Sequence, residues 1–310
     1  MKKVFITALC CIELSICTAS AQIKNYNLDV ESGFILDEST GEMYSAFYGK
    51  EYKLDKKEFG YGKDGYMHIK GKDWSDNYKE YIAVGTDYVT SRFAEKTANP
   101  KKYDLENFPP FYKSEIIKSI TASSYLIETV KGQTVNYTAD NIGKIYYWGS
   151  CKCHPKDFNR FNHIPWVEGK EDYGIGETIT VELKENVYGF KVLNGYVDLE
   201  NTTFYKENSR VKIFKVEDLE NGESKTLSLK DVVQFTDFLF EKPTSKFRLT
   251  ILDVYKGSKY KDTCVSGLVF ITNSNYKQIE EENQKRLADY LNNLIENKIN
   301  NPITDYEDER

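Results

Sequence analysis

Two stretches decide the fold: Trp166-Val-Glu-Gly-Lys-Glu-Asp-Tyr-Gly-Ile-Gly-Glu177 and Leu249-Thr-Ile-Leu-Asp-Val-Tyr-Lys-Gly-Ser-Lys-Tyr-Lys-Asp-Thr-Cys264. Each sets an apolar run beside a turn that is dense in Gly, Asp, Tyr and Lys. A β-sandwich presents polar sites in this way, on loops that a rigid scaffold holds. We therefore predict that both stretches belong to one β-sandwich and that their loops meet at one of its ends.

Short runs that alternate apolar and polar residues surround these stretches, as half-buried strands do. Asn221-Gly222 predicts a hairpin turn among them, because both central positions of such a turn favour positive φ. The runs occupy residues 120–127, 179–183, 188–193, 211–214, 226–229, 235–240, 247–252 and 268–271. Short strands with turn signals at close spacing are typical of a sandwich, which we place at residues 113–274.

Residues 120–272 resemble the NADase-type glycan-binding domain, a discoidin-like (galactose-binding-like) jelly roll. That domain is named for the non-catalytic translocation module of a secreted bacterial NAD glycohydrolase. The positions that match the family pattern are Trp166, Glu168, Gly174, Gly176, Glu177, Asn194, Gly195, Tyr196, Asn208, Arg210 and residues 253–263. The resemblance implies non-covalent glycan binding. Residues 145–164 depart from the pattern, because a short polar turn is expected before Trp166.

A sugar site needs aromatic faces and side chains that hydrogen-bond hydroxyl groups. The candidate ring faces are Trp166, Tyr173, Tyr196, Tyr255 and Tyr260. The candidate polar groups are Glu168, Asp172, Glu177, Asn194, Asn208, Arg210, Asp253, Lys259 and Asp262. The alternative for each residue is a structural role, with the aromatic rings filling the core and Arg210 forming an ion pair with Glu177.

Three of these carboxylates, Glu168, Asp172 and Glu177, lie close together in the chain. Paired carboxylates act as acid and nucleophile or base in a glycosidase. Carboxylates in a Gly-rich loop more often cap backbone amides or bind a cation, and the resemblance makes a structural Ca²⁺ ion the favoured candidate. The chain also has no GxSxG, HExxH or P-loop motif, and contains only three His residues. We therefore expect a non-catalytic protein and assign no catalytic residue.

Composition and the N-terminus indicate the class and compartment of the protein. The chain has 24 Tyr, 17 Phe, a net charge of −6 and no basic block, which favours β-structure and argues against a nucleic-acid partner. Residues 1–21 read as a signal peptide, with Lys2 and Lys3 before an apolar run and Ala19-Ser-Ala21 as the cleavage site. No later run is long enough to span a membrane. We expect export to the periplasm or beyond, with lipid attachment at Cys17 as the alternative.

Signal removal would leave three cysteines, Cys151, Cys153 and Cys264. In an oxidising compartment we expect a disulfide between Cys264 and one of the other two. The alternative use of Cys151 and Cys153 is a zinc site with His154 and His163, although their spacing is not that of a common zinc motif.

The rest of the chain falls into three segments of unknown family. Residues 22–112 show weak strand signals, which predict a small β-rich region. The pattern of residues 275–301 predicts an amphipathic helix, and residues 302–310 form an acidic tail. The helix would dock on the sandwich or bind a protein partner. Two other functions stay open: a secreted enzyme with catalysis in residues 22–112, and a structural or assembly protein of the cell envelope.

Overall fold

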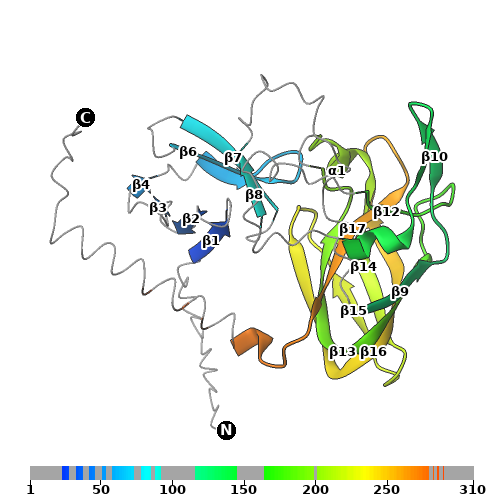
Figure 1. Cartoon of the computed structure of the whole chain (residues 1–310). Helices are drawn as coiled ribbons and strands as arrows, with labels where there is room; N and C mark the ends of the chain where they lie inside the picture. The colour runs from blue at the N-terminus through cyan, green and yellow to red at the C-terminus, as the bar shows by residue number, and fades with distance from the viewer. Residues whose placement is uncertain are drawn as a thin grey trace, which may run out of the picture.

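The computed structural model describes the N-terminal strands and most of the predicted sandwich (Figure 1). The described residues are 23–27, 33–37, 42–45, 51–53, 58–72, 78–84, 88–91, 116–144, 164–198, 201–278, 282, 285 and 289. The predicted signal peptide, Cys151, Cys153 and the acidic tail lie outside them. The predicted mainly β architecture is confirmed.

The sandwich is built from one sheet that folds over on itself. Its strands are β9 (Ile117–Ala122), β12 (Trp166–Val167), β13 (Thr178–Asn194), β14 (Ser209–Asp218), β15 (Ser224–Ser228), β16 (Phe235–Tyr255) and β17 (Thr263–Ile271). The sheet order is β12-β17-β13-β16-β14-β15, and β9 also pairs with β13. All neighbours are antiparallel except the short β14–β17 contact.

The two long strands, β13 and β16, carry the chain from one layer to the other. The first half of β13 pairs with β9 and its second half pairs with β17. Between the halves, the β13–β16 register shifts at Glu182 to Val187 and again at Gly189. Such irregularities bend a strand and increase its local twist. The bend allows one continuous sheet to enclose a core.

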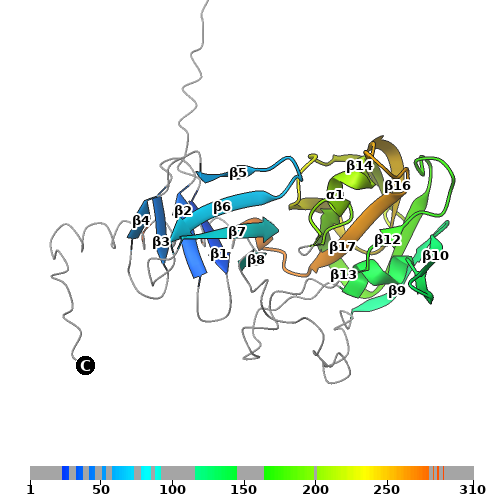
Figure 2. The ribbon, with the colours of Figure 1, turned by 90° about the horizontal axis from the view of Figure 1, so that it is seen from above.

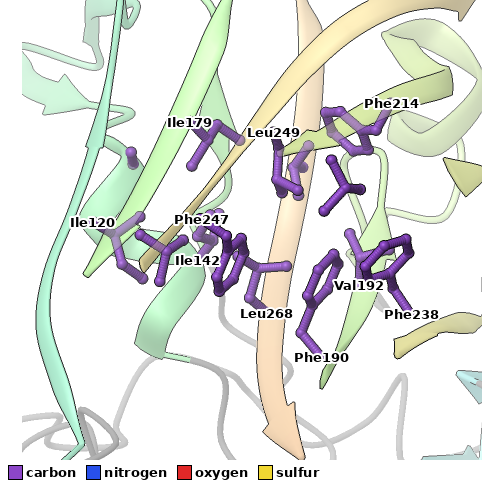
Figure 3. Packing of buried hydrophobic residues seen from close by; sticks show 14 of the residues in the cluster. Ile120, Ile142, Ile179, Phe190, Val192, Phe214, Phe238, Phe247, Leu249 and Leu268 are labelled. Atoms are coloured by element: carbon purple, nitrogen blue, oxygen red, sulfur yellow. The ribbon is translucent and has the colours of Figure 1, made fainter. Parts of the chain in front are cut away.

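That core lies between the two layers and is rich in phenylalanine (Figure 3). The first residues of β13 alternate between buried and half-buried side chains, as the sequence pattern predicts. Phe190 stacks between Phe238 and Phe247, with centroid separations of 5.3 and 5.0 Å. Burying one such side chain stabilises a fold by about 1.5–3 kcal/mol. This packing provides the rigid scaffold from which the loops project.

Two hairpins join neighbouring strands of the sandwich region. β10 (Ile127–Val130) and β11 (Gln133–Asn136) are connected by Lys131 and Gly132, both with positive φ. The predicted turn at Asn221-Gly222 does connect β14 to β15. Only Gly222 has a positive φ there, however, because the loop is longer than two residues and the Asp218 carboxylate accepts hydrogen bonds from its backbone. The position of this turn was predicted correctly and its type was not.

The N-terminal region forms two four-stranded antiparallel sheets, in agreement with its predicted β character. The first contains β1 (Ile23–Asn27), β2 (Gly33–Asp37), β3 (Glu42–Ser45) and β4 (Glu51–Lys53). The second contains β5 (Phe59–Tyr61), β6 (Met67–Lys72), β7 (Tyr78–Val84) and β8 (Tyr88–Ser91). Figure 2 shows the second sheet beside the short helix α1 (Phe204–Glu207) of the sandwich.

The segment after β17 has helical backbone at residues 276–278, 282, 285 and 289. Its first residue contacts the sandwich, since the Tyr276 hydroxyl donates a 2.6 Å hydrogen bond to Asp237 and Lys191 lies over the Tyr276 ring. The predicted helical character is confirmed at these positions. Within the described residues, no helix has the length and apolar character that a membrane crossing requires.

Candidate functional site

Three loops meet at one end of the sandwich, which we call the loop end. The first loop (168–177) joins β12 to β13, the second (195–198 and 201–208) joins β13 to β14, and the third (256–262) joins β16 to β17. Thr263, the first residue of β17, connects the third loop to the first loop. The Glu168 amide donates to Thr263 O at 3.1 Å, and Thr263 Oγ1 donates to Tyr173 O at 2.8 Å. The two stretches that the sequence singled out therefore do meet.

Backbone hydrogen bonds also tie the third loop to the second. The amides of Lys259 and Tyr260 donate to Glu207 O at 3.0 and 2.9 Å, and the Ser258 amide donates to Lys206 O at 2.9 Å. The chains approach so closely that a Cβ on Gly257 would lie 2.5 Å from Glu207 O. Glycine is therefore required at that position, and main-chain hydrogen bonds hold the third loop to the second.

Two tyrosine–lysine pairs lie on the surface of the loop end. The Tyr260 ring on the third loop is 41% exposed, with Lys259 Nζ at 4.8 Å from its centroid. The half-buried Tyr173 on the first loop has Lys256 Nζ at 4.9 Å from its centroid. An ammonium group over a ring face is attracted by the ring quadrupole. These pairs combine an apolar face with charged hydrogen-bond donors.

The carboxylates of the first loop mostly hold its backbone. Asp172 accepts a 2.7 Å hydrogen bond from the Gly174 amide, and Glu177 accepts a 2.6 Å hydrogen bond from Ser123 Oγ. Across the described part of the chain, no three His, Cys, Asp or Glu residues gather in a group that could hold a metal ion. The Asp172 contact is the backbone capping that was one alternative to catalysis, whereas Glu177 binds a side-chain hydroxyl group.

Glu168 has an unusual environment for a carboxylate. Its side chain is fully buried, Oε2 accepts a 2.7 Å hydrogen bond from the Lys170 amide, and Oε1 has no hydrogen-bond partner among the described residues. Burial, with the nearby charges of Asp262 and Asp172 adding to its effect, raises the pKa of Glu168 to about 7. A group without exposed surface does not reach a ligand at the loop end, so we assign Glu168 a structural role.

Trp166 is also a core residue rather than a ligand-stacking ring. Its side chain has no exposed surface and packs in the main core, while Nε1 donates a 2.9 Å hydrogen bond to Ser124 O. The described structure gives the Trp166 ring no exposed face, so we leave this residue out of the site that we propose below. β12 pairs with β17, and this pairing turns the ring inward.

Three polar candidates, Asn194, Asn208 and Arg210, are buried and fix the shape of the second loop. Asn194 bonds both the carbonyl and the amide of Val211, at 2.6 and 3.1 Å. Asn208 Nδ2 donates to the Phe204 carbonyl of α1 at 2.9 Å. These contacts occupy both Asn amide groups inside the fold, so we leave the two residues out of the site that we propose below.

Arg210 pairs with Asp231 and not with Glu177, the partner that the sequence suggested. Its Nε and Nη2 donate to the two carboxylate oxygens of Asp231 at 2.8 and 3.0 Å. Nη1 donates to the carbonyls of Tyr205, Lys206 and Asn208. The guanidinium therefore has partners for all its nitrogens within the fold, and it holds α1 to the neighbouring loop.

The remaining candidates lie beside the loops or partly within them. The Tyr255 hydroxyl donates to Leu229 O at 3.0 Å, and Asp253 pairs with Lys212 at 2.7 Å, so both groups hold β16 to its neighbours. Tyr196 packs against Tyr137 and Phe204, and burial raises its pKa to about 12. Asp262 is half-buried, and burial raises its pKa as well.

Cys264 is fully buried and has no disulfide partner among the described residues, and because Cys151 and Cys153 lie outside them, the disulfide between Cys264 and one of these two stays a prediction. Its thiol lies 3.6 Å from Asp262 O at the start of β17, where burial raises the thiol pKa. Cys151, Cys153, His154 and His163 lie outside the described residues. The alternative, a zinc site that Cys151 and Cys153 form with the two histidines, stays a prediction as well.

Sequence reasoning did not name Lys256 or Asp231 as candidate side chains, although Lys256 lies within the matched residues 253–263. Lys256 stands directly after Tyr255 in the quoted stretch, and its proximity to a Gly-Ser turn was the available signal. Asp231 lies in a separate polar segment, 21 residues from its partner Arg210, and nothing in the local pattern marks it.

Comparison with known proteins gives one family and several solved structures. The family model "NAD glycohydrolase translocation F5/8 type C domain" matches residues 111–271. No curated protein matches the chain. Similar solved structures include the family 32 carbohydrate-binding module of Clostridium perfringens NanJ in complex with galactose, at 12% identity over 52% of this chain and 96% of that one, with a TM-score of 0.31. The corresponding module of Streptococcus pneumoniae EndoD is 12% identical over 51% and 99% of the two chains, with a TM-score of 0.32.

Proposed function

The chain belongs to the NAD glycohydrolase translocation F5/8 type C domain family, and we propose that it binds carbohydrate through the loop end without catalysing a reaction. One observation carries the proposal. Tyr260 offers an exposed ring on a loop fixed by its backbone, with Lys259 beside that ring and the Tyr173–Lys256 pair on the adjoining loop. An aromatic face packs on the C–H face of a sugar, and charged donors bind its hydroxyl groups.

The non-catalytic part of the proposal rests on the positions of the carboxylates. Asp172 and Glu177 cap backbone or hydroxyl groups, and Glu168 is buried beneath the surface. A glycosidase instead needs two carboxyl groups that flank the scissile bond. Because these carboxylates make contacts inside the fold, they support glycan binding rather than glycan hydrolysis.

A site that consists of two partly exposed rings and flexible lysines would bind weakly. We expect dissociation constants in the mM to μM range for a single sugar. Display of several copies, or of several sugars on one glycoconjugate, would raise the apparent affinity. Export, which the predicted signal peptide at residues 1–21 supports, would bring the protein to such glycoconjugates.

Tyr260→Ala is expected to weaken glycan binding about tenfold or more while leaving the fold intact, because the side chain is exposed and contributes a ring face. The measurement is a glycan array with residues 22–310, followed by titration calorimetry on the best glycan. Repeating the array with a chelator tests the predicted structural Ca²⁺ ion.

Tyr125→Ala is the matched control, because Tyr125 is similarly exposed, at 45%, but lies before β10 rather than on one of the three loops. It should bind as the unaltered chain does. A blank array from folded protein, or equal affinity of the Tyr260→Ala variant and the unaltered chain, would contradict the proposal. If both variants lose glycan binding, the binding site lies closer to β10 than we propose.

A further inference from the structure

The turn between β5 and β6 docks on the second loop of the sandwich. Tyr66 at the end of this turn and Ile82 on β7 are both fully buried. They share one apolar cluster with sandwich residues, namely Leu193, Val197, Tyr205 and Val233. The amide of Val233 also donates a 2.8 Å hydrogen bond to Gly65 O. The N-terminal sheet therefore completes a core of which the sandwich supplies the other side.

Tyr66 fixes the second loop with its hydroxyl group as well as its ring. Its Oη donates to Asp198 O at 3.0 Å and accepts from the Asp198 amide at 2.9 Å. These bonds satisfy backbone groups of a loop that would otherwise need water. Burial raises the Tyr66 pKa, so the hydroxyl stays protonated and continues to donate.

Tyr205 of α1 is held between two glycines that come from distant parts of the chain. A Cβ on Gly65 would lie 2.7 Å from Cδ1 and Cε1 of the ring, and a Cβ on Gly195 would lie 2.5 Å from Cε2. Both glycines have positive φ, at +88° and +79°. The Tyr66 ring meets the Tyr205 ring edge-on at 6.1 Å. The turn 62–66 and the sandwich thus enclose Tyr205 from two sides.

Helix α1 transmits this constraint to the third loop. Lys206 and Glu207, which follow Tyr205 directly, offer the carbonyls that accept the amides of Ser258, Lys259 and Tyr260. α1 spans only four residues, so its own hydrogen bonds contribute little to its stability. Its position depends on the packing of Tyr205 and on the Arg210 contacts.

We propose that the turn 62–66 is a brace that positions the third loop, and with it Tyr260, by holding Tyr205 and α1. Gly65 and Tyr66 are then positioning residues of the sandwich, and β5–β8 belong to its binding apparatus. The effect of the brace on glycan binding rests on the proposed function, whereas its effect on the order of the third loop does not. Deleting the N-terminal region would expose the Tyr205 side of the cluster and release the third loop.

The test is amide hydrogen exchange on residues 22–310, comparing Tyr66→Ala with the unaltered chain. We expect exchange at Ser258, Lys259 and Tyr260 to accelerate about tenfold or more, with β13 and β16 amides in the main core unchanged. Tyr66→Phe, which keeps the ring and loses the two hydrogen bonds, should give a smaller acceleration at the same amides. It also serves as the folded variant if Tyr66→Ala does not fold.

Leu227→Ala, which removes a buried side chain of β15 in the main core, is the control for general destabilisation. Unchanged third-loop exchange in a folded Tyr66 variant would overturn the proposal. So would acceleration that is uniform over all amides, or the same third-loop acceleration in Leu227→Ala.

Glycan titration of the same variants separates this proposal from the proposed function. If the third-loop amides of the Tyr66 variants exchange faster but the unaltered chain binds no glycan, the brace is supported and the sugar site is rejected. The opposite outcome is also possible. If Tyr260→Ala weakens glycan binding while Tyr66→Phe changes neither glycan binding nor third-loop exchange, the sugar site is supported and the brace is rejected.

Discussion

Trp166→Ala is expected to lower the free energy of unfolding by about 3–5 kcal/mol, the usual cost of removing a large aromatic side chain from a core. The ring has no exposed surface, it packs in the main core, and its Nε1–H bonds Ser124 O. Removing it leaves a cavity and an unpaired carbonyl. Denaturant unfolding of residues 22–310, followed by circular dichroism, measures the effect as a lower transition midpoint.

Trp166→Phe is the matched variant, because it keeps a ring and loses the N–H group. We expect it to cost about 1–3 kcal/mol, since the Ser124 carbonyl stays without its partner. A Trp166→Ala protein with unaltered stability and no glycan binding would contradict this expectation and return the ring to the ligand site. We expect Trp166→Ala to lose glycan binding and stability together. That result would not show whether Trp166 contacts the sugar, because the loss of stability alone would explain it.

The sequence predicted the parts of the fold that local pattern controls. The alternation at the start of β13 follows from strand periodicity and the position of the turn at Gly222 from turn chemistry, whereas the junction of the loops at Tyr173 and Thr263 follows from placing both stretches in one sandwich. These features depend on residues near each other in the chain or on the antiparallel pairing that a sandwich imposes.

The sequence did not predict which polar and aromatic side chains of the loops point inward. A Trp beside Glu and Gly reads equally well as an exposed ring or as a core residue, and only its pairing with β17 decides. Arg210 finds its carboxylate 21 residues away, and Tyr66 meets Asp198 across 132 residues. Such contacts join residues that are far apart in the sequence, so no local pattern reports them.

Glu168→Gln is expected to remove a pH dependence of stability that is built into the first loop. Burial raises the pKa of the Glu168 carboxyl to about 7, from the ordinary glutamate value of 4.5. Between these two values the folded state binds more protons than the unfolded state, so the free energy of unfolding falls as the pH rises. The stabilisation is fully present below about pH 4.5 and is lost as the pH passes through about 7.

The size of the effect follows from the two pKa values and amounts to about 3 kcal/mol between pH 4 and pH 8. Gln keeps an oxygen that accepts the Lys170 amide and carries no charge, so the variant avoids the cost of burying an anion. We therefore expect Glu168→Gln to match the unaltered chain near pH 4 and to exceed its stability at pH 8. Urea unfolding at both pH values measures the difference.

Glu171→Gln, an exposed position on the same loop, is the matched control and should follow the pH profile of the unaltered chain. If Glu168→Gln is less stable than the unaltered chain at pH 8, the charged form of Glu168 must have a partner that stabilises it, and the unpaired Oε1 would be the place to look for a bound cation. If the two proteins differ equally at both pH values, the substitution acts through packing. The expected result instead shows that the stability of the fold depends on protonation of the buried Glu168 carboxyl.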